Sequence, residues 1–496
     1  MLFSSYIFLF GFLPVTLAGF CLLSRRAGPK AAKIWLSLAS LFFYGWWNPA
    51  YVALILLSMG FNFQMGRRLG TAAREGRAHR GMLASGVGAN LLLLGYYKYA
   101  GFFVANVNAA LGVHWTIPAI VLPLGISFFT FTQIAYLIDA SRGLACEYDP
   151  GDYLLFITFF PHLIAGPIIH HREMMPQFAE PKTYRFDWNN LALGLQIFAV
   201  GLFKKVGLAD NLSDDANRVF NSAHRALYAT DAWQAALDYA FQIYFDFSGY
   251  SDMAIGLARM FGITLPLNFD SPYRAVNLID FWRRWHMTFS RFLRDYLYIP
   301  LGGNRRGPGR RYLNLVVTMA LGGLWHGAAW TYVLWGLYHG VCLALNQLAR
   351  SLWPRPGSAG LSPAWLTPWT GRVVTLFLVV VGWVLFRAGD LDAVGHMLGA
   401  MFGWGTPPAA GAPPILRWTH RFWFIGLFFI VWALPNTARL SDAYHPYSGS
   451  SGEPAPGQEW WARWRLSPAW ACVVAALLAA SVLSLQNASE FLYYNF

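Results

Sequence analysis

Residues 312–349 read YLNLVVTMALGGLWHGAAWTYVLWGLYHGVCLALNQLA, a stretch that contains no Asp, Glu, Lys or Arg. A helix that crosses a bilayer needs about 20 apolar residues, so this stretch is long enough for two. Arg311 and Arg350 bracket it, and arginines beside apolar segments favour the cytoplasmic side of a membrane. The chain must therefore enter the bilayer and return, which predicts a helical hairpin within the membrane.

The rest of the chain also has the composition of a membrane protein. Of its 496 residues, 56% are hydrophobic and only 12% are charged, against about 25% charged in soluble domains. The net charge of +13 does not indicate nucleic-acid binding, because the basic residues flank apolar segments instead of forming a basic domain. The basic clusters at residues 25–33, 67–80 and 305–311 instead predict cytoplasmic loops.

Apolar segments recur along the whole sequence and predict an all-α, polytopic membrane protein with about 11–14 transmembrane or re-entrant helices. We expect one integral membrane domain over residues 1–496, with both termini outside and connectors at residues 354–368 and 436–465. The four cysteines have no paired spacing, which argues against a disulfide framework. The predicted helical segments are 3–23, 32–47, 49–66, 82–105, 118–138, 153–171, 188–203, 232–247, 250–263, 312–325, 328–349, 373–386, 422–435 and 468–486.

His326 lies near the predicted turn of the hairpin. Fifteen helical residues after Arg311 would place it roughly 22 Å into a core of about 30 Å. An ionisable side chain at that depth is costly and indicates function. Glycines at 322, 323 and 327 weaken the helix there and admit a substrate, and Trp325 and Trp330 are candidate pocket walls. A histidine suits proton transfer near neutral pH, so His326 is the candidate base. For His339, which has no such glycine break, a structural role is favoured.

A second histidine, His286, stands in the segment FWRRWHM of residues 281–287. Its aromatic and basic neighbours fit an interfacial belt with basic anchors. They fit equally well a site where Arg283 and Arg284 contact an anionic donor that carries phosphates.

Asp246 and Asp252 flank Gly249, which suggests a helix break between them. The favoured interpretation of both carboxylates is an ion pair with Arg259, Arg283 or Arg284; a catalytic acid or base is the second. A broken helix lining a cavity and an interface turn both explain the prolines beside His162, His170 and His171. No set of His, Cys and carboxylate residues has metal-ligand spacing, so no metal is expected.

Five segments together resemble the membrane-bound O-acyltransferase (MBOAT) family, in particular its bacterial alginate and exopolysaccharide O-acetyltransferase branch. The resemblance is densest from Phe241 to Trp335, within a core of residues 120–350, and is weaker over the C-terminal helices at 371–496. The segments are 159–167, 245–256, 280–286, 294–306 and 321–330.

The resemblance implies a ring of helices around a thinned central funnel, with His326 catalytic and His286 the other histidine of the site. We expect a cytoplasmic donor thioester, acetyl-CoA, at the inner mouth near His286, Arg283 and Arg284, with no bound cofactor. The resemblance also implies the bacterial inner membrane, a periplasmic acetyltransferase partner and a polysaccharide synthase machinery. The candidate donor-binding residues are Trp282, Arg283, Arg284, Trp285 and Asn304, and the candidate pocket residues are Trp325, Trp330, Asp246 and Asp252.

Three alternatives stay open. One is transfer of D-alanine or another acyl group to a cell-wall polymer, although Tyr298 to Arg306 is similar to the polysaccharide-acetylating branch. A second is a transporter of a polysaccharide precursor with His326 as a gate or proton relay. The third is a scaffold for a polymer-modifying assembly.

Overall fold

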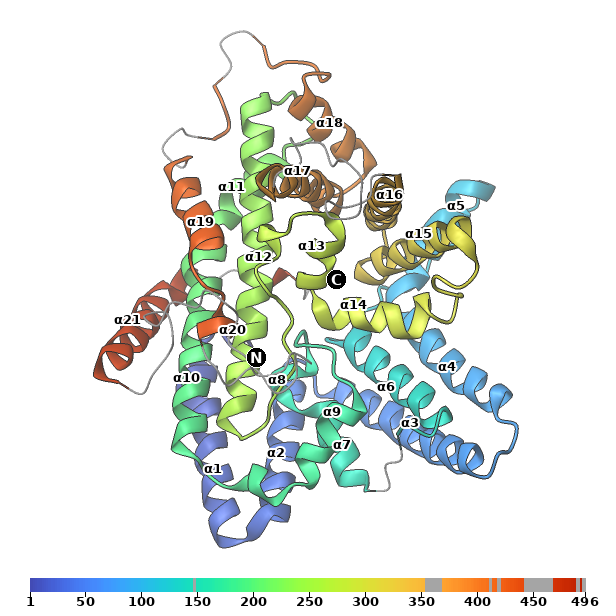
Figure 1. Ribbon diagram of the computed structural model, residues 1–496, viewed down its shortest axis with the longest axis vertical. Coiled ribbons are helices and arrows are strands. Elements are labelled where there is room, and N and C mark those ends of the chain that lie inside the picture. Colours follow the sequence, from blue (N-terminus) through green and yellow to red (C-terminus); the bar gives the residue numbers. More distant parts are fainter. Residues whose placement is uncertain are drawn as a thin grey trace.

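The computed structural model describes residues 1–145, 149–352, 368–409, 413–416, 421–440, 467–487 and 491–492. Throughout these ranges every regular element is a helix, which confirms the predicted all-α class (Figure 1). The predicted connectors at 354–368 and 436–465 fall almost entirely outside the described residues.

The N-terminal third forms two groups of antiparallel helices. Arg25 and Arg26 end the first helix of the first pair, and Lys33 of the next helix pairs with Asp152. The turn of this pair lies at the lower end of the molecule in Figure 1, and the turn at residues 75–79 lies at its lower right edge. The elements are η1 (Phe8–Phe12), α1 (Leu13–Arg26), α2 (Gly28–Gly45), α3 (Ala50–Arg74), α4 (Arg80–Leu94), η2 (Gly95–Tyr99) and α5 (Ala100–Leu111).

The segments predicted at 118–138 and 153–171 are not single helices. Residues 113–123 have no regular secondary structure and are mostly exposed, and α6 (Ile126–Ser141) begins only after Pro118 and Pro123. Proline lacks the N–H that a helix interior needs, which explains both corrections. The second segment divides into α7 (Pro150–Thr158), α8 (Phe160–Leu163), a buried irregular stretch at 164–170 and α9 (His171–Ala179).

Two long, closely packed helical segments form the centre of the fold. The first comprises α10 (Trp188–Leu202), η4 (Phe203–Ala209) and α11 (Asp210–Phe220), and it follows η3 (Pro181–Tyr184). The second is α12 (Ala229–Met260), a continuous helix of 32 residues that runs from the upper to the lower end of Figure 1. The break predicted at Gly249 is therefore wrong.

Gly249 instead allows α12 to approach the first segment closely. A Cβ atom at Gly249 would lie 2.7 Å from the carbonyl oxygen of Gly201, and one at Gly201 would lie 2.6 Å from that of Gly249. Gly194 and Gly256 repeat this arrangement at 2.5 and 2.6 Å, seven residues away on each helix. Small residues are the usual means of close helix packing in membranes.

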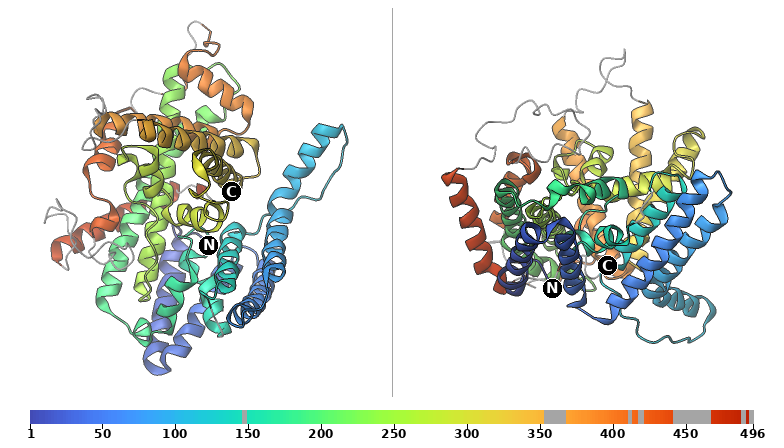
Figure 2. Two further views of the ribbon diagram at one scale, coloured as in Figure 1. Left: turned by 45° about the vertical axis from the view of Figure 1, so that its right-hand side comes forward. Right: turned by 90° about the horizontal axis from the view of Figure 1, so that it is seen from below.

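The remaining helices lie around the central segments, with residues 368–402 packed on α12 and residues 468–484 packed on α10. The predicted hairpin is present, since α15 ends at His326 and α16 begins at Trp330. Figure 2 shows the same elements from two further directions. They are η5 (Pro272–Arg274), α13 (Leu278–Arg284), α14 (Met287–Leu293), η6 (Arg294–Tyr298), α15 (Gly307–His326), α16 (Trp330–Leu352), α17 (Pro368–Arg387), α18 (Leu391–Phe402), α19 (Arg421–Ala433), α20 (Thr437–Leu440), α21 (Pro468–Ser484) and η10 (Leu485–Asn487).

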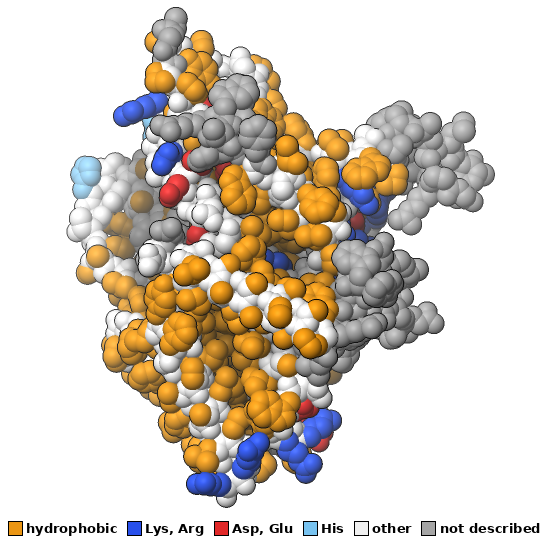
Figure 3. Space-filling model, turned by 90° about the vertical axis from the view of Figure 1, so that its left-hand side faces the viewer, with side chains coloured by type: hydrophobic (Ala, Val, Ile, Leu, Met, Phe, Trp, Pro, Cys, Tyr) orange, Lys and Arg blue, Asp and Glu red, His pale blue; other side chains and the backbone are white. Residues whose placement is uncertain are grey.

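The surface is apolar over a broad area, as expected for a protein that lipid surrounds. Hydrophobic side chains cover the middle of the face in Figure 3, and Lys and Arg gather at its lower end. Large apolar side chains such as Phe10, Leu57 and Leu92 are 66%, 74% and 76% exposed. By length and composition, the helical segments Phe8–Arg26, Trp188–Phe220 and Pro368–Arg387 are able to cross a membrane.

Candidate active site

The main chain of His326 is fixed by a segment more than 200 residues earlier in the sequence. His326 is the last residue of α15, and Gly327 follows in an extended conformation. The last carbonyls of a helix have no partner within it. Lys98 of η2 donates to the carbonyl oxygens of Trp325 at 2.5 Å and His326 at 3.3 Å, and the Tyr99 hydroxyl donates to that of Leu324 at 2.8 Å.

Glycines hold α15 against α16 and so place His326 at the end of the hairpin. A side chain at Gly323 would collide with the backbone of Tyr332, and one at Gly336 with the backbone of Met319. Gly340 continues this contact, because a Cβ there would lie 2.7 Å from the Cα of Val316.

The imidazole of His326 is enclosed by aromatic rings. It is 3% exposed, and the surrounding ring centroids lie at 5.0 Å for Trp325, 5.2 Å for Trp335, 5.2 Å for Phe386 and 5.3 Å for Phe289. Trp325, the predicted pocket wall, thus packs directly on the imidazole of His326.

Trp330, the other predicted wall, lies elsewhere. It is 53% exposed, and its indole N–H donates to Asn106 Oδ1 at 2.8 Å, which ties α16 to α5. Trp330 is the first residue of α16, five positions before Trp335, so the helix turns it away from the face that packs on His326.

His286 lies beside His326. It connects α13 to α14 with a φ of 42°, a left-handed conformation that is rare for a residue other than glycine. The ring of Phe289 packs against both histidines, with centroid distances of 4.9 Å to His286 and 5.3 Å to His326. The structure thus brings together two histidines that are 40 positions apart in the sequence.

A buried asparagine orients His286. Its Nδ1 lies 3.0 Å from Asn268 Oδ1, which also accepts hydrogen bonds from the Thr288 hydroxyl at 2.9 Å and the Thr288 N–H at 3.4 Å. The amide nitrogen of Asn268 donates to Ser251 Oγ at 3.1 Å. Since Oδ1 is an acceptor, Nδ1 of His286 carries the proton, and in the neutral ring Nε2 carries the lone pair.

The other residues of the segment 281–287 occupy different environments. Trp282 packs on Trp335 with a centroid distance of 5.7 Å, so it belongs to the aromatic group around His326. Trp285 is buried against Trp383. Arg284 pairs with Asp280 at 2.8 Å and with Asp270 at 3.5 Å.

Arg283 and Asn304 lie outside the aromatic group. Arg283 is exposed. Asn304 is also exposed; it accepts a hydrogen bond from the Tyr298 hydroxyl and precedes α15. Asn304 lies just before the first residue of α15, whereas His326 is the last residue. The helix between them is about 28 Å long.

Asp246 and Asp252 are both paired, but with lysines instead of the predicted arginines. Lys205 lies 2.7 Å from Asp246 and 2.7 Å from Asp210, and Lys204 lies 2.7 Å from Asp252. Both lysines belong to the π-helical segment η4 that packs on α12. The pairing is local to the α10–α12 contact, where Gly201 and Gly249 bring the backbones close enough for it.

The remaining histidines have separate surroundings. His162 contacts the carbonyl oxygen of Phe156 at 3.0 Å, and His170 lies 3.0 Å from the Tyr296 hydroxyl, which donates to Asp139 at 2.9 Å. His339 is buried between Trp282 and Trp335. In the part of the chain that the structure describes, no three His, Cys, Asp or Glu side chains are grouped as metal ligands.

A polar cavity of about 490 Å³ adjoins the aromatic group. Phe386, whose ring packs on His326, and Tyr332, whose ring packs on Gly327, both line it. Phe386 thus contacts both the cavity and His326, and the Tyr332 ring packs on Phe386 with a centroid distance of 5.0 Å. The other lining residues are mostly hydrogen-bonding groups: Ser213, Asn217, Asn221, Tyr239, Gln242, Ala329, Thr331, Arg387, Ala388, Gly389 and Leu492.

The family follows from comparison with known proteins. Residues 126–359 match the model of the membrane-bound O-acyltransferase family, and several curated relatives about 40% identical match most of the chain. The chain belongs to the membrane-bound O-acyltransferase (MBOAT) family and is an O-acyltransferase.

Two of these relatives carry names of different O-acetyltransferases. The chain is 43% identical to the peptidoglycan O-acetyltransferase of Helicobacter pylori, over 81% of this chain and 80% of that protein. It is 39% identical to the probable alginate O-acetylase AlgI of Azotobacter vinelandii, over the full length of both. A teichoic acid D-alanyltransferase of Bacillus subtilis is 30% identical over 53% of this chain and 68% of its own length.

Sequence reasoning alone missed four residues that shape the site. Lys98 had a signal, because a lone lysine within an apolar segment is costly in a membrane and needs partners. Asn268, Trp335 and Phe386 had none, since polar and aromatic residues are common across this sequence and their contacts arise only from the packing of distant helices.

Proposed function

We propose that this chain transfers acetyl groups from a cytoplasmic thioester to a hydroxyl group, for O-acetylation of a bacterial cell-surface polysaccharide. The observation that carries the proposal is the pair His286 and His326, which share the ring of Phe289 in a buried aromatic group. The cavity beside this group, rich in hydroxyl and amide side chains, suits an acceptor that carries hydroxyl groups.

The chemistry requires one base and one buried reaction centre. His326 accepts the proton of the acceptor hydroxyl, and the oxygen attacks the thioester carbonyl. The C–S bond then breaks, an O-acetyl ester remains, and the departing thiolate takes up the proton. His286, held by Asn268 with its lone pair on Nε2, is the second base of the site. The direct transfer does not need a covalent acetyl-histidine, although His326 is also a competent acyl carrier.

The acceptor side is the polar cavity. Phe386 lies against both the cavity and His326, with Tyr332 packed on it, so acceptor entry requires the Phe386 side chain to move. Names of the relatives offer alginate and peptidoglycan as model acceptors. Transfer of D-alanine is less favoured, because the D-alanyltransferase match covers only about half of the chain. A periplasmic acetyltransferase that receives the acetyl group and a polysaccharide synthase machinery are the proposed partners.

We place the donor, acetyl-CoA, on the cytoplasmic side of the bacterial inner membrane, with Arg283 as the first candidate contact. Arg284 is already compensated by Asp280 and Asp270, whereas Arg283 is exposed.

Substituting Arg283→Ala is expected to raise the acetyl-CoA concentration needed for half-maximal transfer by about tenfold, the loss of one charge-assisted contact, without lowering the maximal rate. The measurement is initial rate against donor concentration in purified protein, with the exposed Arg77→Ala as control. An unchanged donor dependence would remove Arg283 from the donor site.

The decisive test of function is thioester turnover. Purified protein in lipid nanodiscs receives acetyl-CoA labelled in the acetyl group, with oligosaccharides of alginate or peptidoglycan, or with the periplasmic partner, as acceptor. We expect free CoA and an alkali-labile acetyl ester in equal amounts. Uptake of a polysaccharide precursor into sealed vesicles without any thioester cleavage would instead identify a transporter.

A further inference from the structure

The polar cavity of about 490 Å³ beside Phe386 is called the acceptor cavity below. A second and larger cavity, of about 920 Å³, lies toward the opposite end of α12 and is called the basic cavity. Its wall contains Arg259, and the acceptor cavity contains Tyr239 of the same helix. Twenty helical residues separate the two positions, or about 30 Å, which is close to the thickness of a bilayer core.

The cavity lies beside the basic turn between α1 and α2. Arg25 of α1 stacks over the ring of the wall residue Phe186 at 5.3 Å, and Lys33 of α2 lies over Tyr184 of η3 at 5.8 Å. Basic residues beside apolar helices favour the cytoplasm, so this end of the molecule is the cytoplasmic one.

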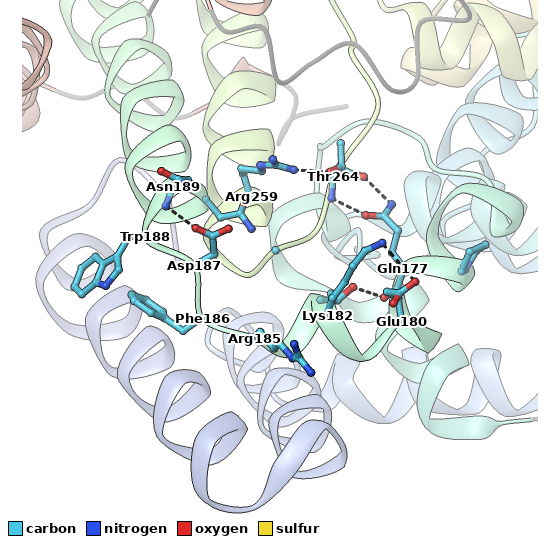
Figure 4. Close-up of a pocket in the computed structure, with 14 residues that line it drawn as sticks. Gln177, Glu180, Lys182, Arg185, Phe186, Asp187, Trp188, Asn189, Arg259 and Thr264 are labelled. Carbon is cyan, nitrogen blue, oxygen red and sulfur yellow. Dashed lines mark hydrogen bonds and ion pairs between the residues drawn. The ribbon is translucent and has the colours of Figure 1, made fainter. Parts of the chain in front are cut away.

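The wall carries an excess of positive charge. Figure 4 shows Lys182, Arg185 and Arg259 around the cavity, together with the acidic residues Glu180 and Asp187. Asp187 accepts the N–H of Asn189 at 2.7 Å as the cap of α10, and Glu180 lies 3.5 Å from Lys182. Arg259 donates to the Thr264 hydroxyl at 3.0 Å, which fixes its guanidinium at the cavity.

Arg185 is exposed and forms no ion pair with any residue that the structure describes. Arg25 adds a further positive charge, because it lies over the ring of Phe186. The cations at the cavity therefore outnumber its carboxylates. An anion with several acceptor oxygens fits this arrangement, since arginines bind phosphates in a bidentate manner.

An apolar side accompanies these charges. Trp188 and Phe186 pack edge to face at 4.8 Å, on the side of the cavity toward α1 in Figure 4. Trp188 is 72% exposed, and Leu22 of α1 is 49% exposed. Tryptophan beside an apolar helix surface is typical of the level of lipid headgroups.

We propose that this cavity binds the phosphate-bearing headgroup of an anionic phospholipid at the cytoplasmic surface of the membrane. Basic pockets between membrane helices on this side are the usual sites for such headgroups. The nucleotide of an acyl donor carries the same phosphate chemistry, but the exposed Trp188 and the lipid-facing side of α1 favour a ligand whose tail lies in the bilayer.

The test compares the purified protein in nanodiscs of phosphatidylcholine alone and of phosphatidylcholine with phosphatidylglycerol or cardiolipin. The pocket variant is Lys182→Gln with Arg185→Gln, and the control is Arg77→Gln with Arg80→Gln, which removes the same charge from exposed positions at residues 75–80. Retention of anionic lipid is measured by native mass spectrometry, and the unfolding temperature is measured in each disc.

We expect the wild type and the control to retain anionic lipid and to unfold at a higher temperature when it is present. The pocket variant should lose at least about tenfold in lipid affinity, the loss of two charge-assisted contacts. Equal retention by the pocket variant and the control would overturn the proposal. If the double variant is already less stable in neutral discs, the single variant Arg185→Gln is compared with the control instead.

A separate arm titrates adenosine 3′,5′-bisphosphate. Displacement of the lipid by this nucleotide, or stabilisation of the wild type by it but not of the pocket variant, would make the cavity a nucleotide site and contradict the lipid assignment. No effect of the nucleotide supports the lipid. This result is independent of acetyl transfer at His326, which is measured in the same samples.

Discussion

At the scale of single residues, Lys98 and Tyr99 decide where the main chain of His326 lies. They supply donors to three carbonyls at the end of α15 that the helix itself leaves without partners. A cation at a helix C-terminus is also favoured by the helix dipole. The imidazole of His326, the proposed base, is thus placed through its backbone, and the aromatic rings around it then restrict its orientation.

Replacing Lys98 tests this positioning role. Lys98→Met keeps the length of the side chain but removes the donor, and each unsatisfied buried carbonyl costs about 1–3 kcal/mol. We expect acetyl transfer to fall about tenfold or more, with little change in the donor concentration for half-maximal rate, and Lys98→Arg to recover part of the activity. Rates per amount of folded protein are compared with the exposed Lys30→Met. Full activity of Lys98→Met would contradict the positioning role.

The two histidines could be predicted from the sequence, but their surroundings could not. His326 could be identified because it is an ionisable residue beside three glycines in an otherwise uncharged stretch. Asn268 lies in an irregular segment 18 positions before His286, and Lys98 lies 228 positions before His326. Contacts over such separations follow from helix packing, which no local pattern encodes.

At the scale of elements, glycines determine how closely the helices pack. Gly323, Gly336 and Gly340 hold α15 against α16, and Gly201 and Gly249 do the same for the central pair. In both places one backbone rests directly on the other. A larger side chain has no room to rotate away from a backbone atom.

A substitution at Gly336 tests the hairpin. Gly336→Leu would drive α16 away from Met319 and displace His326 from Trp335. Such overpacking costs roughly 1–3 kcal/mol of folding free energy, or more. We expect a lower unfolding temperature and loss of most transfer activity. Gly60→Leu is the matched control, because nothing lies within 4 Å of a side chain at that position. Identical stability and activity of the two variants would show that the close contact is unimportant.

The sequence predicted most helices but not every boundary. At the turn of the hairpin the helix ends lie within two residues of the prediction, because the glycines beside His326 mark that turn. The other end of α15 was predicted too late, since the helix begins at Gly307 and includes Arg310 and Arg311. At Gly249 the prediction was wrong, since a glycine that breaks a helix and one that packs it look alike in the sequence. The prediction of a helix at 118–138 followed hydrophobicity and neglected Pro118 and Pro123. The helix begins only after them, at Ile126.

At the scale of the whole molecule, the two cavities lie at opposite ends of the long central helices. Asn221 follows α11 beside the acceptor cavity, and Arg185 precedes α10 beside the basic cavity. The proposed function needs the first cavity on the periplasmic side, and the lipid proposal needs the second on the cytoplasmic side.

Cysteine labelling checks this topology. In a chain whose four native cysteines are replaced by serine, the substitutions Asn221→Cys and Arg185→Cys introduce single exposed thiols. In cells with a permeable outer membrane, an impermeant maleimide should label position 221 at once and position 185 only after the inner membrane is opened. Equal labelling of both in intact cells would refute the assigned sides.

The proposed function depends on His326 as the centre of acyl transfer. Transfer of labelled acetyl groups from acetyl-CoA is compared between the wild type, His326→Ala and the control His114→Ala, an exposed histidine before α6. We predict normal transfer by the wild type and the control, and a loss of at least about a hundredfold in His326→Ala, the usual contribution of a general base. Transfer at the wild-type rate by folded His326→Ala would show that His326 is not the base of the reaction.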